Sequence, residues 1–221
     1  HRFKQMAGNI APASAQPFMQ GRRLHHTDFG SGEHSEKGNP VFDGLRGKLG
    51  PLFVAKSCVE CHANNGRALP PAAGAPMLQT VVKTGSNEKG SPHEKLGGAL
   101  QPKSVSGDGD GSASIVNWKE ISGTYGDGTP FTLRRPVYAF AGGAPAAYSV
   151  RLTPPLVGMG LLEAVSERDV LALADAQDAN RDGISGRPQI VTDAETGQPR
   201  LGRFGYKGAQ ATLKQQIAHA L

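Results

Sequence analysis

Both cysteines of this 221-residue chain lie in one pentapeptide, Cys58-Val59-Glu60-Cys61-His62. On a helix, positions i, i+3 and i+4 share one face. Two thiols one turn apart can bond the two vinyl groups of a single porphyrin, while the adjacent imidazole ligates the iron. The motif therefore predicts one covalently attached haem c, held by Cys58 and Cys61 with His62 as an axial ligand.

Two other chemistries use paired cysteines. A redox-active dithiol of the thioredoxin type needs a strand before the motif in a βαβ context, and a structural zinc ion needs a second pair of ligands. The sequence shows neither pattern. The flanks favour a helix that begins at Gly50-Pro51 and ends near Asn64-Asn65-Gly66.

The composition suits a protein whose core is completed by a cofactor. The chain has 30 glycines, 16 prolines and 38% apolar residues, which favours short helices joined by long ordered loops. Its formal charge is +5, but the basic residues are scattered, so we do not expect nucleic-acid binding. An acidic redox partner or an ordinary solvated surface fits the charge better. No stretch of about 18 apolar residues occurs, so we expect no transmembrane segment.

The N-terminal third and the middle of the chain differ in pattern. Residues 1–40 have little periodicity apart from one short helix around Gly21, which we expect to pack against the haem helix. Residues 31–40 read as loop. Between about 77 and 150 the pattern favours strands, namely residues 78–82, residues 114–118, and a hairpin over residues 121–138 with its turn at residues 125–128.

Helical spacing returns after the β-rich stretch. Residues 161–176 predict a helix, or a helix pair broken near Ser166, which together with Asp169 marks an internal cap. A last helix is expected over residues 211–221. It ends at the apolar Leu221 without a stop signal, so we expect the natural chain to continue.

These patterns together predict a mainly α, cytochrome c-like haem domain with a β-rich insertion and long loops. The expected boundaries are an N-terminal extension at residues 1–40 and the haem domain at residues 41–221, with the insertion at about 77–150. Haem is attached to such a motif on the exported side of the bacterial membrane. The expected compartment is therefore periplasmic or extracellular.

Several motifs in order resemble the di-haem oxidoreductase family of putative peroxidases, which is related to bacterial di-haem cytochrome c peroxidases. The resemblance covers roughly residues 45–221. Its first motifs are Gly50-Pro51-Leu52-Phe53 before the cysteine motif, Gly66-Arg67, the run from Gly123 to Pro130, and Leu133-Arg134-Arg135-Pro136. Its later motifs are the run from Gly158 to Ala164, Asp182-Gly183-Ile184-Ser185-Gly186-Arg187, and Gly202-Arg203-Phe204-Gly205-Tyr206-Lys207.

The resemblance implies two haem domains and hence a second Cys-x-x-Cys-His motif beyond the end of this chain. Three functions stay open. The first is an electron-transfer cytochrome domain whose partner is a redox protein or the second haem domain. The second is the catalytic haem domain of a peroxidase that reduces hydrogen peroxide. The third is a haem protein that serves as a sensor or a structural module.

The second axial ligand of the iron is predicted to be Met159, which directly precedes a helix as the ligating methionine does in small cytochromes c. Core packing would explain this methionine almost as well. His93 and Met77 are alternatives, and Met6 and Met19 are weaker ones.

Two charged residues are candidates for supporting roles. Glu163 follows Met159 by four positions and could move a proton in peroxide chemistry, although an exposed or capping glutamate explains it equally well. Arg67 lies just after the haem helix and could pair with a haem propionate, although it could equally be a surface arginine.

A calcium-binding loop is a further hypothesis. Asp178, Asn180 and Asp182 occupy positions one, three and five of a loop with Gly183 at position six. Position twelve is Gln189 rather than glutamate. Related bacterial peroxidases hold calcium near their haem domains, but an acidic turn that bonds its own backbone explains the same residues.

Overall fold

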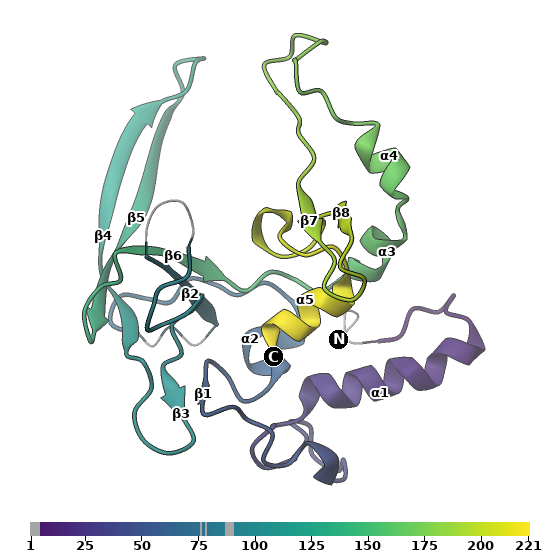
Figure 1. Ribbon diagram of the computed structural model, residues 1–221. Coiled ribbons are helices and arrows are strands. Elements are labelled where there is room, and N and C mark those ends of the chain that lie inside the picture. The colour runs from purple at the N-terminus through teal and green to yellow at the C-terminus, as the bar shows by residue number, and fades with distance from the viewer. Residues whose placement is uncertain (1–4, 76, 78, 87–90) are drawn as a thin grey trace. The chain divides into compact units, whose positions relative to one another are not determined.

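The computed structural model describes residues 5–75, 77, 79–86 and 91–221, and it divides the chain into two compact units (Figure 1). Unit 1 comprises residues 1–156 and unit 2 comprises residues 157–221. Within the described residues no helix is both long and apolar enough to cross a bilayer.

The fold class is mixed, so the expectation of a mainly α domain is wrong. Strands account for 27% of the chain and helices for 22%. Of the described helices only α1 (Ala15–His26) and α5 (Leu213–Ala220) reach seven residues. One physical reason is that glycine and proline interrupt the helical segments and keep them short. The other is that the β-branched and aromatic residues of the middle segment form long strands.

Unit 1 contains the cysteine motif. Its helix α2 (Cys58–Cys61) is a single turn, and α1 lies against it, as predicted. Three 3₁₀ turns complete the helical structure described in this unit, at Pro12–Ser14, Asp43–Leu45 and Ala63–Asn65.

Three antiparallel strand pairs form the rest of unit 1 (Figure 1). They are β1 (Leu52–Phe53) with β3 (Lys103–Ser104), β2 (Thr80–Gly85) with β6 (Ala147–Leu152), and β4 (Ser112–Thr124) with β5 (Pro130–Ala141). The predicted helix start at Gly50-Pro51 is therefore wrong, because the residues that follow it pair as β1. Leu78, which was expected to begin a strand, lies outside the described residues.

The predicted hairpin is confirmed and is longer than expected. Strands β4 and β5 pair from Ser112 with Ala141 to Thr124 with Pro130. The turn between them is closed by the Tyr125 amide, which donates to the Thr129 carbonyl at 2.9 Å, and by the Gly128 amide, which donates to the Tyr125 carbonyl at 2.9 Å. Gly128 has φ = 87°, a conformation that glycine adopts without steric cost.

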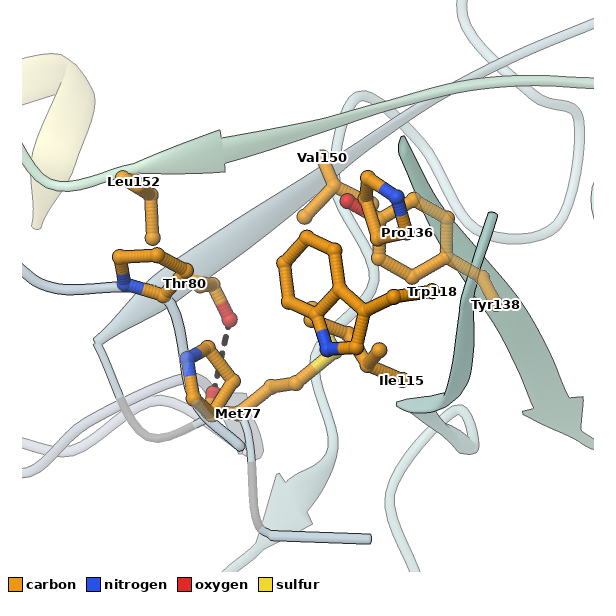
Figure 2. A pocket seen from close by; sticks show the side chains of 10 residues that line it. Met77, Thr80, Ile115, Trp118, Pro136, Tyr138, Val150 and Leu152 are labelled. Carbon is orange, nitrogen blue, oxygen red and sulfur yellow. Dashed lines mark hydrogen bonds between the residues drawn. The ribbon is translucent and has the colours of Figure 1, made fainter. Parts of the chain in front are cut away.

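The apolar core of unit 1 lies where the hairpin meets the β2–β6 pair. Ile115 is 2% exposed, and it lines an open pocket of about 250 Å³ whose walls are mostly aromatic and aliphatic side chains (Figure 2). The Met77 side chain points into this pocket toward Trp118, and the Thr80 hydroxyl donates to the Met77 carbonyl at 2.8 Å (Figure 2). Met77 thus occupies the place of a packing residue, since a thioether packs well against an aromatic ring.

Unit 2 contains α3 (Met159–Ala164), α4 (Glu167–Leu171), the antiparallel pair β7 (Ile190–Thr192) and β8 (Pro199–Leu201), a 3₁₀ turn at Tyr206–Gly208, and α5. The predicted break between two helices is confirmed. Ser166 is the N-cap of α4, and its hydroxyl accepts from the Asp169 amide at 3.1 Å. Leu201, Phe204 and Ala211 form the buried apolar core of the unit.

Replacing Ser166 with alanine is expected to lower the free energy of unfolding by about 1 kcal/mol, because the Asp169 amide loses its capping acceptor. Urea denaturation followed by circular dichroism measures this change. Ser166→Asp restores an acceptor at the same position and should recover most of the loss. Equal destabilisation by both variants would contradict the capping role.

Candidate functional site

The cysteine motif forms one helical turn that presents all three haem-binding candidates. Ser57 precedes the turn in an extended conformation, with φ = −148° and ψ = 158°. The His62 amide donates to the Cys58 carbonyl at 2.9 Å and closes the turn. Cys58 and Cys61 therefore begin and end α2, and His62 directly follows it as the C-cap.

The chain leaves this segment at the predicted position. Asn64 and Asn65 both have φ = 57°, in the left-handed region that asparagine tolerates better than most residues. Gly66 then continues in an extended conformation, and its amide donates to the Ala63 carbonyl at 3.0 Å. The chain therefore turns at Asn64 and Asn65 and does not continue along the axis of α2.

Both cysteines are thiols rather than a disulfide. Burial raises the pKa of the Cys58 thiol. Burial also raises the pKa of the Cys61 thiol, and the negative charge of Glu60 adds to this effect. A thioether forms when an S–H bond adds across a vinyl group, so both side chains have the protonation state that haem attachment requires.

His62 is oriented by a carbonyl far away in the sequence. Its Nδ1 lies 2.9 Å from the Pro154 carbonyl oxygen, 92 positions along the chain. A carbonyl can only accept, so the ring proton is on Nδ1 and Nε2 carries the lone pair. Burial lowers the pKa of His62 and thereby favours the neutral ring. A metal-ligating histidine has this arrangement, in which the second nitrogen donates to an oxygen that fixes the ring.

Hydrogen bonds to residues that follow α2 hold the segment that supplies the Pro154 carbonyl. The Thr153 hydroxyl and amide both donate to the Gln79 carbonyl, at 2.9 Å and 3.2 Å. The Ala68 amide donates to the Thr153 carbonyl at 2.9 Å, and the Leu156 amide donates to the Asn65 carbonyl at 3.0 Å. Residues 153–156 thus form a brace across the end of the motif.

Glu60 anchors the opposite side of the turn. Its carboxylate accepts from the Lys56 amide at 3.0 Å and lies 3.9 Å from the Lys103 ammonium group, which is on β3. The Gln79 side-chain amide donates to the Glu60 carbonyl at 3.3 Å. These contacts of Glu60 and the brace at residues 153–156 hold the backbone of α2 at both ends.

The sequence did not predict that His25 and His26, at the end of α1, and His34 would form a group beside His62. The His25 and His62 rings have centroids 6.5 Å apart, the His25 and His26 rings 5.3 Å, and the His26 and His34 rings 5.0 Å. The only signal in the sequence was the His25-His26 pair at the end of a predicted helix. Nothing in the sequence indicated that this pair would lie beside the haem motif.

Two other predicted contributors in unit 1 have ordinary surroundings. Arg67 is exposed one residue after Gly66, and its pairing with a propionate stays a prediction. His93 lies in a tight turn, where its Nδ1 accepts from the Lys95 and Leu96 amides at 3.2 Å each. Its ring proton is therefore on Nε2, so that nitrogen has no lone pair for a metal.

Met159 and Glu163 both lie on α3 in unit 2, four positions apart on one face, as predicted. Glu163 is exposed, and its carboxylate accepts from the Leu213 amide at 2.7 Å. Leu213 is the first residue of α5, so this carboxylate stabilises the positive end of that helix. The axial role of Met159 and the proton-transfer role of Glu163 stay predictions.

The side-chain oxygens of the hypothetical calcium loop accept hydrogen bonds from backbone amides of the same loop. The Asp178 carboxylate accepts from the Gly183 amide at 3.2 Å, and the Asp182 carboxylate accepts from the Ile184 amide at 2.8 Å. The Asn180 side-chain oxygen accepts from the Asp182 amide at 3.1 Å. Among the residues the structure describes, no group of three or more His, Cys, Asp or Glu side chains is arranged to hold a metal ion. Calcium binding therefore stays a prediction without a formed ligand set.

The comparisons with known proteins give one match. Residues 145–221 match the sequence model of the family described as "Di-haem oxidoreductase, putative peroxidase". Searches of curated proteins and of solved structures each returned no match. The matched segment includes β6, the Pro154 brace and all of unit 2, and the family name implies haem. The resemblance inferred from the sequence motifs is thus confirmed over residues 145–221, which are similar to the di-haem oxidoreductase family.

Proposed function

We propose that this chain is a c-type cytochrome domain that carries one covalent haem and transfers electrons as part of a di-haem oxidoreductase. The observation that carries the proposal is the bond from His62 Nδ1 to the Pro154 carbonyl at 2.9 Å. This hydrogen bond leaves the lone pair of His62 on Nε2, away from the brace at residues 153–156. The thiols of Cys58 and Cys61 belong to the same turn. Two thiols and one imidazole are the groups that bind haem c, whereas a structural zinc site would need a second pair of ligands.

The chain's own residues have separate tasks in this proposal. Cys58 and Cys61 fix the porphyrin through two thioethers, and His62 ligates its iron. The Pro154 carbonyl sets the ring orientation of His62 and increases its basicity as a ligand. When bound, the haem supplies a one-electron redox centre.

The distribution of apolar side chains supports a cofactor or domain that covers part of the chain. Large apolar residues of unit 2 are strongly exposed on its helices and loops, including Leu161 at 78%, Leu173 at 80% and Ile184 at 69%. Exposed large apolar side chains are a feature of surfaces that a partner protein covers. We propose that a second haem domain, or a redox partner protein, covers these residues.

The proposed compartment is periplasmic or extracellular, because covalent haem attachment to this motif occurs there. Subcellular fractionation of the native host tests the proposed compartment directly. Recovery of the mature protein with the periplasmic or secreted fraction is the expected result, and recovery with the cytoplasm would contradict it.

Peroxide reduction is the second candidate function, and the family description favours it. It needs a displaceable ligand on the iron and a nearby group that moves a proton between the peroxide oxygens. Glu163 is the candidate for that group, yet its carboxylate already accepts the Leu213 amide. Electron transfer needs only the haem attachment that the cysteine motif provides, so we keep it as the first proposal.

A redox titration followed by visible spectroscopy tests the proposed function. The haem-loaded chain is expected to show one reversible transition with the slope of a single electron, and negligible turnover of hydrogen peroxide with a reduced dye. Rapid peroxide turnover by this chain alone would favour the peroxidase instead. The absence of a reversible transition would contradict both.

A further inference from the structure

Beyond the register shift between Ile115 and Asn117, strands β4 and β5 form a two-stranded ribbon with two different faces (Figure 1). Directly opposed residues of an antiparallel pair share a face, and the faces alternate along each strand. On the first face Trp118 is opposed to Pro136, and both residues line the pocket of unit 1 (Figure 2). We call this face, which is packed at its base, the inner face.

The opposite face of the ribbon, which we call the outer face, is exposed and largely apolar. It carries Ile121 opposed to Leu133, and Val137 opposed to Asn117. All three apolar side chains are exposed, Leu133 to 55%. In the described part of the chain no third strand joins β4 and β5, and a ribbon of two strands buries little apolar surface by itself. A contiguous apolar face that stays exposed is a feature of surfaces that a partner covers.

Two aromatic rings hold the end of the outer face that lies nearest the turn. Phe131 is opposed to Gly123, and its ring lies so close that a Cβ atom on the glycine would be 2.7 Å from it. The Tyr125 ring contacts the Phe131 ring, with their centroids 4.9 Å apart. Side chains that are ordered before binding lose little conformational entropy when a partner docks. This end of the outer face is therefore formed in advance.

The outer face also carries a pair of uncompensated positive charges. Lys119 and Arg135 are directly opposed there, an arrangement in which like charges destabilise a strand pair. The inner face has no such conflict, because Glu120 is opposed to Arg134. Among the residues that the structure describes, no carboxylate lies within 4.0 Å of the Lys119 or Arg135 side-chain nitrogens. The two cations are thus available to a carboxylate from outside the chain.

We propose that the outer face is a docking surface for a second protein whose contact patch is apolar and contains a pair of carboxylates. The apolar part of that patch covers Ile121, Leu133 and the aromatic end of the face. Its carboxylates pair with Lys119 and Arg135. Protein interfaces combine an apolar centre with complementary charges in this way, and the charges set the register and the choice of partner. The inference does not depend on the proposed function, because no residue of the outer face belongs to the haem motif.

Two other occupants fit the outer face less well. A second copy of this chain, docked by two-fold symmetry, would bring the same face against itself. The strand residues of this face include two cations and no carboxylate, so the two copies would repel each other. An anionic membrane needs more than one basic pair beside a few apolar side chains. In addition, Asp127 in the turn, which accepts from the Thr129 amide at 2.9 Å, keeps a carboxylate at the tip of the hairpin.

Photo-crosslinking in the native host tests the location of the docking surface. Benzoylphenylalanine replaces Leu133 on the outer face in one variant, and in the matched control it replaces the adjacent Thr132 on the inner face. We expect the Leu133 position to crosslink to one partner, through a segment that contains aspartate or glutamate beside apolar residues. We expect no crosslink from the Thr132 position. The absence of a crosslink from Leu133, or equal crosslinking from both positions, would overturn the proposal.

Charge reversal tests the pairing between the two proteins. Arg135→Glu is expected to abolish the crosslink from Leu133, whereas Arg134→Glu, which changes the net charge equally but lies on the inner face, should keep it. Arg135→Glu places a carboxylate opposite Lys119, so the urea midpoint of unfolding should not fall. Lysine in place of the partner's carboxylates should restore the crosslink to the Arg135→Glu chain. A crosslink that survives Arg135→Glu, or one that the reciprocal change does not restore, would overturn the proposal.

Two further measurements report the other occupants. Analytical ultracentrifugation of the haem-loaded chain reports self-association, and co-sedimentation with phosphatidylglycerol vesicles reports membrane binding. A dimer or a vesicle-bound form that is lost in Leu133→Ser would overturn the proposal in favour of that occupant. A chain that lacks covalent haem but gives the expected crosslinks would contradict the cytochrome proposal alone.

Discussion

Replacing Cys58 and Cys61 together with serine is expected to abolish covalent haem binding. Serine hydroxyls do not add to the porphyrin vinyl groups, so any pigment left in the double variant is held only by iron ligation. Extraction with acidified organic solvent should remove this pigment completely. The unmutated chain should keep its pigment in the protein fraction after the same treatment.

The single variants are the matched controls. Cys58→Ser and Cys61→Ser each leave one thioether, so each should still resist extraction. A double variant that retains pigment through the extraction would show that the porphyrin is attached elsewhere. Loss of pigment from both single variants would show instead that the substitutions disturb α2 rather than the attachment.

Replacing Ile115 with alanine is expected to destabilise the protein by about 2–5 kcal/mol, the usual range for removing a large apolar side chain from a core. Ile115 is 2% exposed, and it lies on β4 where the hairpin packs against the β2–β6 pair. The loss combines the transfer free energy of the removed methyl groups with the cavity that they leave. Denaturant unfolding of the haem-loaded chain measures it as a lower midpoint.

Ile121→Ala is the control for this prediction. Ile121 lies on the same strand but is 43% exposed, so its truncation should change the free energy of unfolding by about 0.5 kcal/mol or less. If the two variants lose the same stability, Ile115 is not the centre of the core of unit 1.

Features set by adjacent residues were predicted well. The Tyr125–Thr129 turn follows from a glycine that adopts a positive φ, and the helix break at Ser166 follows from a hydroxyl that caps the next helix. The end of the haem segment at Asn64 and Asn65 follows from the left-handed conformation that asparagine tolerates. Each of these signals acts within a few residues.

Features set by distant residues were not predictable in the same way. The expected helix at Leu52-Phe53 is a strand because its partner is Lys103-Ser104, about fifty positions away in the sequence. The Pro154 carbonyl that orients His62 comes from a segment 92 positions along the chain, which only the fold brings to the motif. The mainly α prediction failed because the helices are short: of those described, only α1 and α5 reach seven residues, so the predicted β-rich stretch outweighs them.

The site was predictable where covalent chemistry fixes the spacing. Cys58, Cys61 and His62 are identified by a pattern that needs no tertiary structure, whereas an axial ligand can come from any part of the chain. A methionine before a helix was a reasonable expectation for that ligand. The axial role of Met159 therefore stays a prediction.

The mass of the denatured protein tests the central claim most directly. A sample matured in a host that attaches haem c should have the polypeptide mass plus one haem, and the added mass should map to the peptide that contains Cys58 and Cys61. A mass equal to that of the bare polypeptide, in a host that loads a known cytochrome c in parallel, would contradict the account.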